Sequence, residues 1–159
     1  MADFRNYGIE PEKGRKYENI IYVMALIYDM YMSEISHYLA QYDLSPAKFN
    51  LLMVVAYQGG AKGITQVAIG EKLIVSPGNI TGLVEKLVKD GFITRTQNPQ
   101  SRRENIIKIT AKGQKLIDKV WPGYDALAKK MTDILPGADQ ANLTKILEKW
   151  FGAMKDVKN

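Results

Sequence analysis

The sequence predicts a mainly α-helical α+β fold, in which several helices surround one small antiparallel hairpin. Apolar residues recur three and four positions apart through most of the 159 residues. Ser, Thr or Pro precedes most of these runs and Gly or Pro follows them, which is typical of helix ends. Only Phe92–Gln97 and Asn105–Ile109 are rich in β-branched residues, and they flank a turn-forming segment.

The composition is that of a globular protein, with 46% hydrophobic and 25% charged residues. The chain has no cysteine, which excludes disulfides, thiol redox sensing and cysteine-ligated zinc and agrees with a reducing compartment. Ile20–Met32 is the one segment that suggests a membrane span, but it is too short and Asp29 interrupts it. We therefore expect a cytoplasmic protein with no membrane partner.

The first part of the chain is expected to be a polar arm followed by two helices. Residues 1–16 are polar, and apolar residues then recur at helical spacing over residues 17–41. Ser45 can cap a second helix over residues 46–57, and Pro46 suits its first turn. The strongly apolar sequence of this second helix predicts a central position in the fold.

Two short helices are expected next. Thr65 can cap a helix over residues 66–73, and Ser76 can cap another over residues 77–89, which Gly91 ends. This order of elements predicts a helix-turn-helix.

The hairpin completes that motif. Its strands are expected at 92–97 and 105–109, with Ile64 in a short additional strand. A helix-turn-helix followed by a hairpin is a winged helix-turn-helix, here expected over residues 45–110.

Two helices are expected at the C-terminal end. Thr110 can cap residues 111–135, with a bend at Pro122 because proline removes a ladder hydrogen bond. Pro136-Gly137 ends this helix and Asp139 begins the last one.

Positive charge is concentrated in the middle of the chain. Residues 62–115 hold 10 Lys or Arg and 4 Asp or Glu, a net charge of +6. The rest holds 12 basic and 13 acidic residues, so all the surplus positive charge lies in this third. A polyanion partner and an ordinary solvated face explain this charge equally well on its own.

The helix over residues 77–89 has an apolar face for the core and a polar face opposite. Its apolar residues are Ile80, Leu83, Val84, Leu87 and Val88. On the polar face, Asn79 and Thr81 suit base edges and Lys86 suits a phosphate. Gly82 costs about 1 kcal/mol relative to alanine. A close approach of the helix backbone to DNA is one explanation of this glycine. The other is that the protein is stable enough to tolerate the loss.

The turn of the hairpin is basic, with Arg102 and Arg103 at or near the tip. A guanidinium projected from such a tip suits a narrow, strongly negative minor groove. A solvated basic loop is the alternative. The helix and the hairpin are each weak indications alone, but adjacent and inside the basic segment they predict binding to double-stranded DNA.

The segment from Ile64 to Gly113 resembles the MarR family of bacterial transcription regulators. The residues that carry the resemblance are Ile64-Thr65-Gln66-Val67-Ala68, Leu73, Ser76-Pro77-Gly78-Asn79-Ile80-Thr81-Gly82-Leu83-Val84-Glu85-Lys86-Leu87, Asp90-Gly91-Phe92-Ile93-Thr94-Arg95, Asn98-Pro99-Gln100-Ser101-Arg102-Arg103 and Ile107-Lys108-Ile109-Thr110-Ala111-Lys112-Gly113. The resemblance implies a homodimeric, sequence-specific DNA-binding regulator, usually a repressor, that a small ligand often releases.

Site residues follow from these considerations. The recognition helix is expected to contact DNA through Ser76, Pro77, Gly78, Asn79, Thr81, Gly82 and Lys86. The wing contributes Arg95, Gln97, Arg102 and Arg103, and the helix before the recognition helix contributes Thr65 and Gln66. The resemblance implies that Arg103 enters the minor groove. Ser101 stands where the family usually has an acid, and Asn98 where aspartate is common, so the wing is expected to be less rigid or more positive.

The helices on both sides of the winged domain have more apolar surface than that domain can cover. Residues 1–44 are expected to form an arm and a dimerisation helix, and residues 111–159 dimerisation helices. The expected interface residues are Ile20, Trp121, Tyr124, Leu127, Leu147, Trp150 and Phe151. Burial of these faces against each other within one chain is the alternative. A two-fold dimer would place two recognition helices about 34 Å apart, which predicts a pseudo-palindromic operator.

The effector that the resemblance implies is a small aromatic or phenolic molecule. Tyr38, Phe49 and Met53 are candidate pocket residues, although filling the core is the favoured interpretation of all three. His37 is the one histidine and has no metal-ligating cluster beside it, so neither a metal nor another cofactor is expected.

No set of residues predicts an enzyme. The glycine-rich segment at residues 59–63 lacks the spacing and the Ser or Thr of a phosphate-binding loop. A winged helix that only binds other proteins remains the alternative to a DNA-binding regulator.

Overall fold

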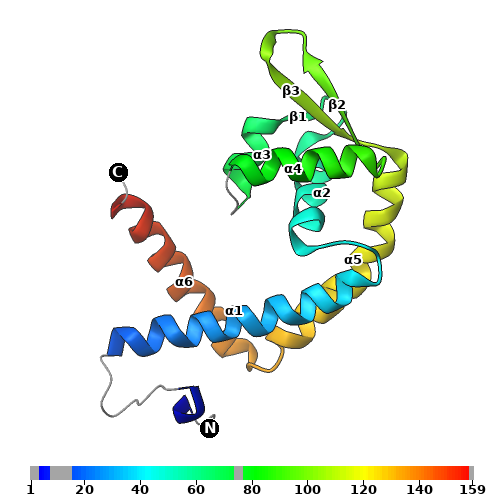
Figure 1. Ribbon diagram of the computed structural model, residues 1–159. Helices are drawn as coiled ribbons and strands as arrows, with labels where there is room; N and C mark the ends of the chain where they lie inside the picture. Colours follow the sequence, from blue (N-terminus) through cyan, green and yellow to red (C-terminus); the bar gives the residue numbers. More distant parts are fainter. Residues whose placement is uncertain (1–3, 8–15, 74–76, 158–159) are drawn as a thin grey trace. The chain divides into compact units, whose positions relative to one another are not determined.

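The computed structural model describes residues 4–7, 16–73 and 77–157 (Figure 1). The helices are η1 (Phe4–Tyr7), α1 (Lys16–Ala40), α2 (Pro46–Gly59), α3 (Gln66–Lys72), α4 (Pro77–Lys89), α5 (Ala111–Thr132) and α6 (Gly137–Val157). The strands are β1 (Ile64–Thr65), β2 (Ile93–Asn98) and β3 (Ser101–Ile109). The mainly helical α+β prediction is confirmed, and the bounds of α4 are those predicted.

The chain divides into two compact units, residues 1–121 and 122–159, so the division falls inside α5 just before Pro122. The first unit contains the helix-turn-helix and the sheet. The second contains the end of α5 and the whole of α6.

Side-chain caps begin several helices where the sequence predicted them. Ser45 Oγ accepts a hydrogen bond from Lys48 N at 3.3 Å, and Thr65 Oγ1 accepts one from Ala68 N at 3.2 Å. Thr110 Oγ1 accepts from Gly113 N at 3.0 Å. Each cap satisfies a backbone N–H that has no partner inside its helix. The fourth predicted cap, Ser76, lies outside the described residues.

The sheet has three antiparallel strands in the order β1-β3-β2. Ile64 pairs with Ile107, which confirms the short strand predicted there. Asn98 pairs with Ser101, so only two residues form the turn of the hairpin.

This pairing corrects one prediction. The third strand begins at Ser101 rather than at Asn105, so Arg102 and Arg103 belong to β3 and follow the turn. The polar sequence suggested a longer turn, because it lacks the β-branched residues that mark a strand. The side chains of both arginines lie outside the described part of the chain.

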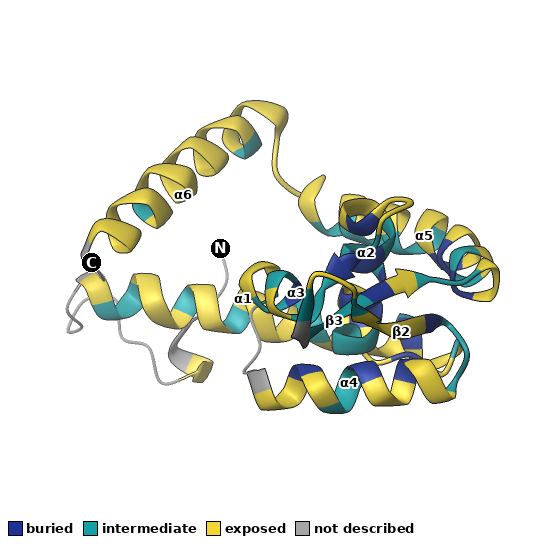
Figure 2. Ribbon diagram, turned by 90° about the horizontal axis from the view of Figure 1, so that it is seen from above, coloured by how far each residue is buried: buried dark blue, intermediate teal, exposed yellow. Residues whose placement is uncertain are grey.

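The core lies around α2, as its apolar sequence predicted (Figure 2). Phe49, Leu51, Leu52 and Val55 of α2 are each at most 1% exposed. Buried side chains from the other elements of this unit include Leu39, Ile69, Ile80, Val84, Leu87, Ile93, Ile107, Ile117 and Val120. Val88 was predicted to face this core but is 37% exposed.

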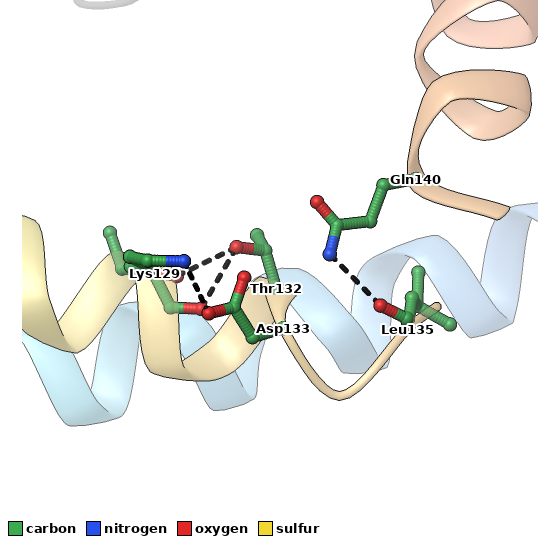
Figure 3. A network of polar contacts seen from close by, with 6 residues as sticks. Lys129, Thr132, Asp133, Leu135 and Gln140 are labelled. Atoms are coloured by element: carbon green, nitrogen blue, oxygen red, sulfur yellow. Dashed lines mark hydrogen bonds and ion pairs between the residues drawn. The ribbon is translucent and has the colours of Figure 1, made fainter. Parts of the chain in front are cut away.

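The second unit is held at its turn by local polar contacts (Figure 3). Lys129 Nζ pairs with Asp133 Oδ2 at 2.5 Å, and Gln140 Nε2 donates to the Leu135 carbonyl at 2.9 Å. The first contact lies at the end of α5, and the second joins the first turn of α6 to the loop that precedes it. In the described part of the chain, no helix has the length and apolar character needed to cross a membrane.

Candidate nucleic-acid interface

The two helices of the helix-turn-helix are packed through small and branched apolar residues. Ile69 of α3 and Ile80 of α4 are buried, and a Cβ added to Gly70 would lie 3.0 Å from Ile80 Cδ1. This close approach positions α4 with its apolar residues inward. Its outward residues are therefore available to a ligand.

The exposed side of α4 gathers the residues predicted to read DNA. Gly78, Asn79, Thr81 and Lys86 are exposed, and Gly82 is half-buried. A Cβ at Gly82 would meet no atom within 4 Å, so packing inside this chain does not require glycine there. Ser76 and the side chain of Pro77 lie outside the described residues.

The helix before α4 adds a polar side chain to the same surface. Gln66 Nε2 donates a hydrogen bond to Thr81 Oγ1 at 2.9 Å, on the exposed side of the two helices. Thr65, in contrast, uses its hydroxyl oxygen to cap α3. The structure therefore brings two predicted site residues into contact and gives a third a helix-capping role.

The wing is shaped by a side chain at its turn. Asn98 Nδ2 donates to Glu104 Oε2 at 3.0 Å, and Asn98 Oδ1 accepts from Gln100 N at 3.0 Å. The ladder is irregular between Gln97 and Asn98. Arg95 and Gln97 of β2 are exposed. Sequence reasoning missed Glu104, whose signal is an acid six residues after Asn98 in a hairpin.

A second polar cluster joins the end of α4 to its neighbours. Lys48 Nζ of α2 pairs with Asp90 Oδ2 at 3.0 Å, and Lys112 Nζ of α5 donates to the Asp90 carbonyl at 2.6 Å. Lys112 Nζ also lies 4.7 Å from the centre of the Phe92 ring, and Thr110 Oγ1 donates to the Gly91 carbonyl at 2.8 Å. These contacts attach the residues that follow α4 to α2 and to the start of α5.

A cavity of about 430 Å³ lies beside the helix-turn-helix. It is lined by Tyr28, Tyr31, Met32, Pro46, Ala47, Asn50, Met53, Val54, Lys72 and Leu73. Met53 is the one predicted pocket residue among them. Phe49 is only 1% exposed and fills the core, and the Tyr38 hydroxyl donates to the Val120 carbonyl at 2.8 Å. Neither side chain lines this cavity.

The predicted interface residues are exposed to different degrees. Ile20 is 52% exposed on α1, and Trp121, Leu147 and Phe151 are also exposed. Tyr124, Leu127 and Trp150 are half-buried. Among the described residues, no three His, Cys, Asp or Glu form a group that could hold a metal ion.

The model of the MarR family matches residues 44–105, which contain both helices of the motif and most of the wing. Over these residues the chain matches the MarR family. Curated relatives of the chain are also helix-turn-helix regulators. A Bacillus subtilis helix-turn-helix regulator, YkoM, is 28% identical to this chain over 69% of this chain and 69% of its own length.

Two further relatives from Bacillus subtilis are a transcriptional regulator and a transcriptional repressor. The regulator MhqR is 26% identical over 80% of this chain and 86% of its own, and the repressor YetL is 28% identical over 77% and 73%. The relatives to which this chain is similar are thus helix-turn-helix transcriptional regulators.

Solved structures of the MarR family share the fold. A MarR-like regulator from Bacillus cereus has a TM-score of 0.78 at 21% identity, covering 88% of this chain and 99% of its own. A mutant Escherichia coli MarR complexed with operator DNA has a TM-score of 0.75 at 24% identity, covering 86% and 98%. CouR from Rhodococcus jostii, bound to p-coumaroyl-CoA, has a TM-score of 0.72 at 22% identity, covering 83% and 91%.

Proposed function

We propose that the chain acts as a homodimeric repressor that binds a pseudo-palindromic DNA operator and is released by a small aromatic or phenolic ligand. The observation that carries this proposal is the exposed polar face of α4 beside the hairpin, within the segment of net charge +6. A recognition helix and a wing of this kind can occupy neighbouring grooves of one duplex.

The DNA contacts are divided between base edges and phosphates. Asn79 and Thr81 read base edges in the major groove, and Lys86 neutralises a phosphate. The remaining contacts of the helix-turn-helix are Thr65, Gln66, Ser76, Pro77, Gly78 and Gly82. The wing binds the minor groove through Arg103, with Arg95, Gln97 and Arg102 beside it.

The dimer is supported by apolar residues that remain exposed in the single chain. Ile20, Trp121, Leu147 and Phe151 are 37–64% exposed, which is costly for side chains of this size. With Tyr124, Leu127 and Trp150 they form the proposed interface. In this proposal, residues 1–44 and 111–159 build the dimer and residues 45–110 bind DNA.

The effector occupies the cavity between α1, α2 and α3. Tyr28 and Tyr31 offer aromatic surface and hydroxyl groups, and Lys72 offers a positive charge to an acidic group. CouR, which shares the fold, binds p-coumaroyl-CoA, and this supports an aromatic ligand class. Since Lys72 ends α3, occupation of the cavity would displace the helix-turn-helix.

Selection of bound duplexes from random-sequence DNA tests the DNA-binding part. The wild-type protein should enrich an inverted repeat, and its affinity should fall steeply as salt rises, because each phosphate contact releases a counterion. Binding without sequence preference would contradict the proposal. Binding that salt hardly changes would favour a protein-interaction module instead.

The ligand part has a separate test with hydroxybenzoates as probes. These should release the selected duplex from the wild-type protein, whereas Met53→Trp should fill the cavity and keep the DNA bound. A Met53→Leu control, which conserves the volume, should still respond. Release that is equal in all three proteins would place the effector elsewhere.

A further inference from the structure

Gln66 and Thr81 are joined across the helix-turn-helix on its exposed side. Gln66 is the first residue of α3, Thr81 lies in α4, and the amide nitrogen of the glutamine donates to the threonine oxygen at 2.9 Å. Within the described part of the chain, neither side chain makes another hydrogen bond. The pair therefore has hydrogen-bonding capacity left over on a surface that faces solvent.

The direction of this bond determines what Thr81 offers to a ligand. A hydroxyl group has one proton and two acceptor positions. Because Thr81 Oγ1 accepts from Gln66, its own proton does not point at the glutamine and is free to donate outward. An exposed neutral hydrogen bond adds little net stability, so the main consequence of the pair is the orientation of the hydroxyl.

We propose that Gln66 is a positioning residue that makes Thr81 a hydrogen-bond donor toward a base edge. This rests on the proposed DNA-binding function and adds a preference to it. In the major groove, adenine, guanine and thymine each present an acceptor, whereas cytosine presents only its amino donor. The outward proton of Thr81 can therefore donate to A, G or T at the base that it faces, whereas C offers it no acceptor, so C is disfavoured there.

Three substitutions separate positioning from simple loss of contact. Gln66→Met keeps the length of the side chain but cannot donate, so the Thr81 hydroxyl is free to turn and accept from cytosine. Thr81→Val keeps the shape and removes the hydroxyl. Thr81→Ser retains the hydroxyl and should preserve the preference.

The probe is a duplex that the wild-type protein selects from random-sequence DNA. Each base pair of a half-site is replaced in turn, and the dissociation constants are compared at one salt concentration. At the position that Thr81 faces, the wild-type protein and Thr81→Ser should bind the duplex with cytosine about fivefold more weakly than the duplex with the preferred base. A fivefold difference in the dissociation constant corresponds to about one hydrogen bond. Gln66→Met and Thr81→Val should each remove most of that difference at the same position.

The control is Gln114→Met, which removes another exposed glutamine bond, to Asp118 at 2.8 Å on α5. It should leave the base preferences unchanged. In the Thr81→Val background, Gln66→Met should have no further effect on the preference. A uniform loss of affinity in Gln66→Met, with the wild-type pattern of preferences intact, would overturn the proposal. If the wild-type protein selected no sequence at all, the proposed function as a sequence-specific DNA-binding protein would itself be contradicted.

Discussion

Asn98 donates a hydrogen bond from its side-chain nitrogen to Glu104 Oε2 at 3.0 Å across the base of the wing turn. Its side-chain oxygen accepts from Gln100 N, also at 3.0 Å. One amide group therefore holds both the turn and the facing strand. An aspartate could accept from Gln100 but could not donate to Glu104. Ser101, where the resemblance implies an acid, is not acidic, and the acid that bonds Asn98 is Glu104 of β3.

Asn98→Asp should therefore loosen the wing, although aspartate is common at this position in the family. The substitution replaces a donor with a negative charge close to the Glu104 carboxylate. We expect affinity for the selected operator to fall about fivefold, which corresponds to roughly 1 kcal/mol for a lost hydrogen bond. Amide hydrogen exchange at residues 97–104 should become faster.

The matched control is the double variant Asn98→Asp with Glu104→Gln. The glutamine amide can donate to the new carboxylate, which restores the bond with its direction reversed. Operator affinity and amide protection should then recover. Loss of the same size in the double variant would show that the bond does not shape the wing.

Gly113→Ala should destabilise the protein, because the added Cβ would lie 2.1 Å from the Phe92 carbonyl oxygen. The Phe92 carbonyl oxygen and carbon belong to the backbone and cannot turn away as the Ile109 side chain, 2.7 Å from the added Cβ, can. We expect a loss of about 1–3 kcal/mol in the free energy of unfolding, the usual cost of overpacking. Urea denaturation of the whole chain measures it.

Gly152→Ala, in α6, is the comparison for that variant. A Cβ there would meet no atom within 4 Å, so only helix propensity changes, by up to about 1 kcal/mol in favour of alanine. Equal effects of the two substitutions would mean that α5 does not pack on Phe92 as described.

Lys86→Ala should flatten the salt dependence of DNA binding. Lys86 is exposed on α4, and the loss of one phosphate contact reduces the slope of log affinity against log salt by about one unit. The variant should weaken binding to all sequences alike. Lys130→Ala, at an exposed position on α5, should leave the slope as it is. A wild-type slope in Lys86→Ala would remove this residue from the interface.

The pair Lys129–Asp133 should add a small pH-dependent stability to the end of α5. The hydrogen bond from Lys129 lowers the pKa of Asp133 below 3.8, and the same bond with the charge of Asp133 raises the pKa of Lys129 above 10.5. The contribution of Asp133 is present above its unfolded pKa and is lost as pH falls through the folded value. The contribution of Lys129 to stability is present below its pKa in the unfolded chain and is lost as pH rises through its pKa in the folded protein.

Both groups are exposed, so solvent screens the pair strongly. NMR titration of the Asp133 carboxyl carbon should give a lower pKa in the wild-type protein than in Lys129→Met. An unchanged pKa would show that the pair does not form in solution.

The sequence predicted the fold well wherever local signals agreed. Helix α4 has its predicted bounds because apolar spacing, Pro77 at its start and Gly91 after its end all indicate one helix, and Gly91 has the left-handed φ of 74° expected there. The start of β3 was missed because Ser101 pairs with Asn98 through the register of the hairpin, which residue types alone do not reveal.

The site was predicted as a set of residue types rather than as contacts. Exposure of Asn79 and Lys86 follows from helical spacing, so their common face was foreseeable. The bonds of Gln66 with Thr81 and of Lys112 with Asp90 join different elements, and they depend on how those elements pack. Phe49 was a candidate pocket residue but is buried in the core. An aromatic residue on a helix suits a pocket and a core equally well, and only its neighbours in the fold decide between the two.

Phe151→Glu should separate the proposed dimer without unfolding the chain. Phe151 is 64% exposed on α6, so a charge there costs little in the monomer but would be buried in the interface. Sedimentation should show a shift toward monomer, and affinity for the full operator should fall toward that for a half-site duplex, whereas half-site affinity should not change. Lys149→Glu adds an acid on the other side of the same helix and should leave a dimer. A Phe151→Glu protein that remains as dimeric as the wild type would exclude this face of α6 from the interface.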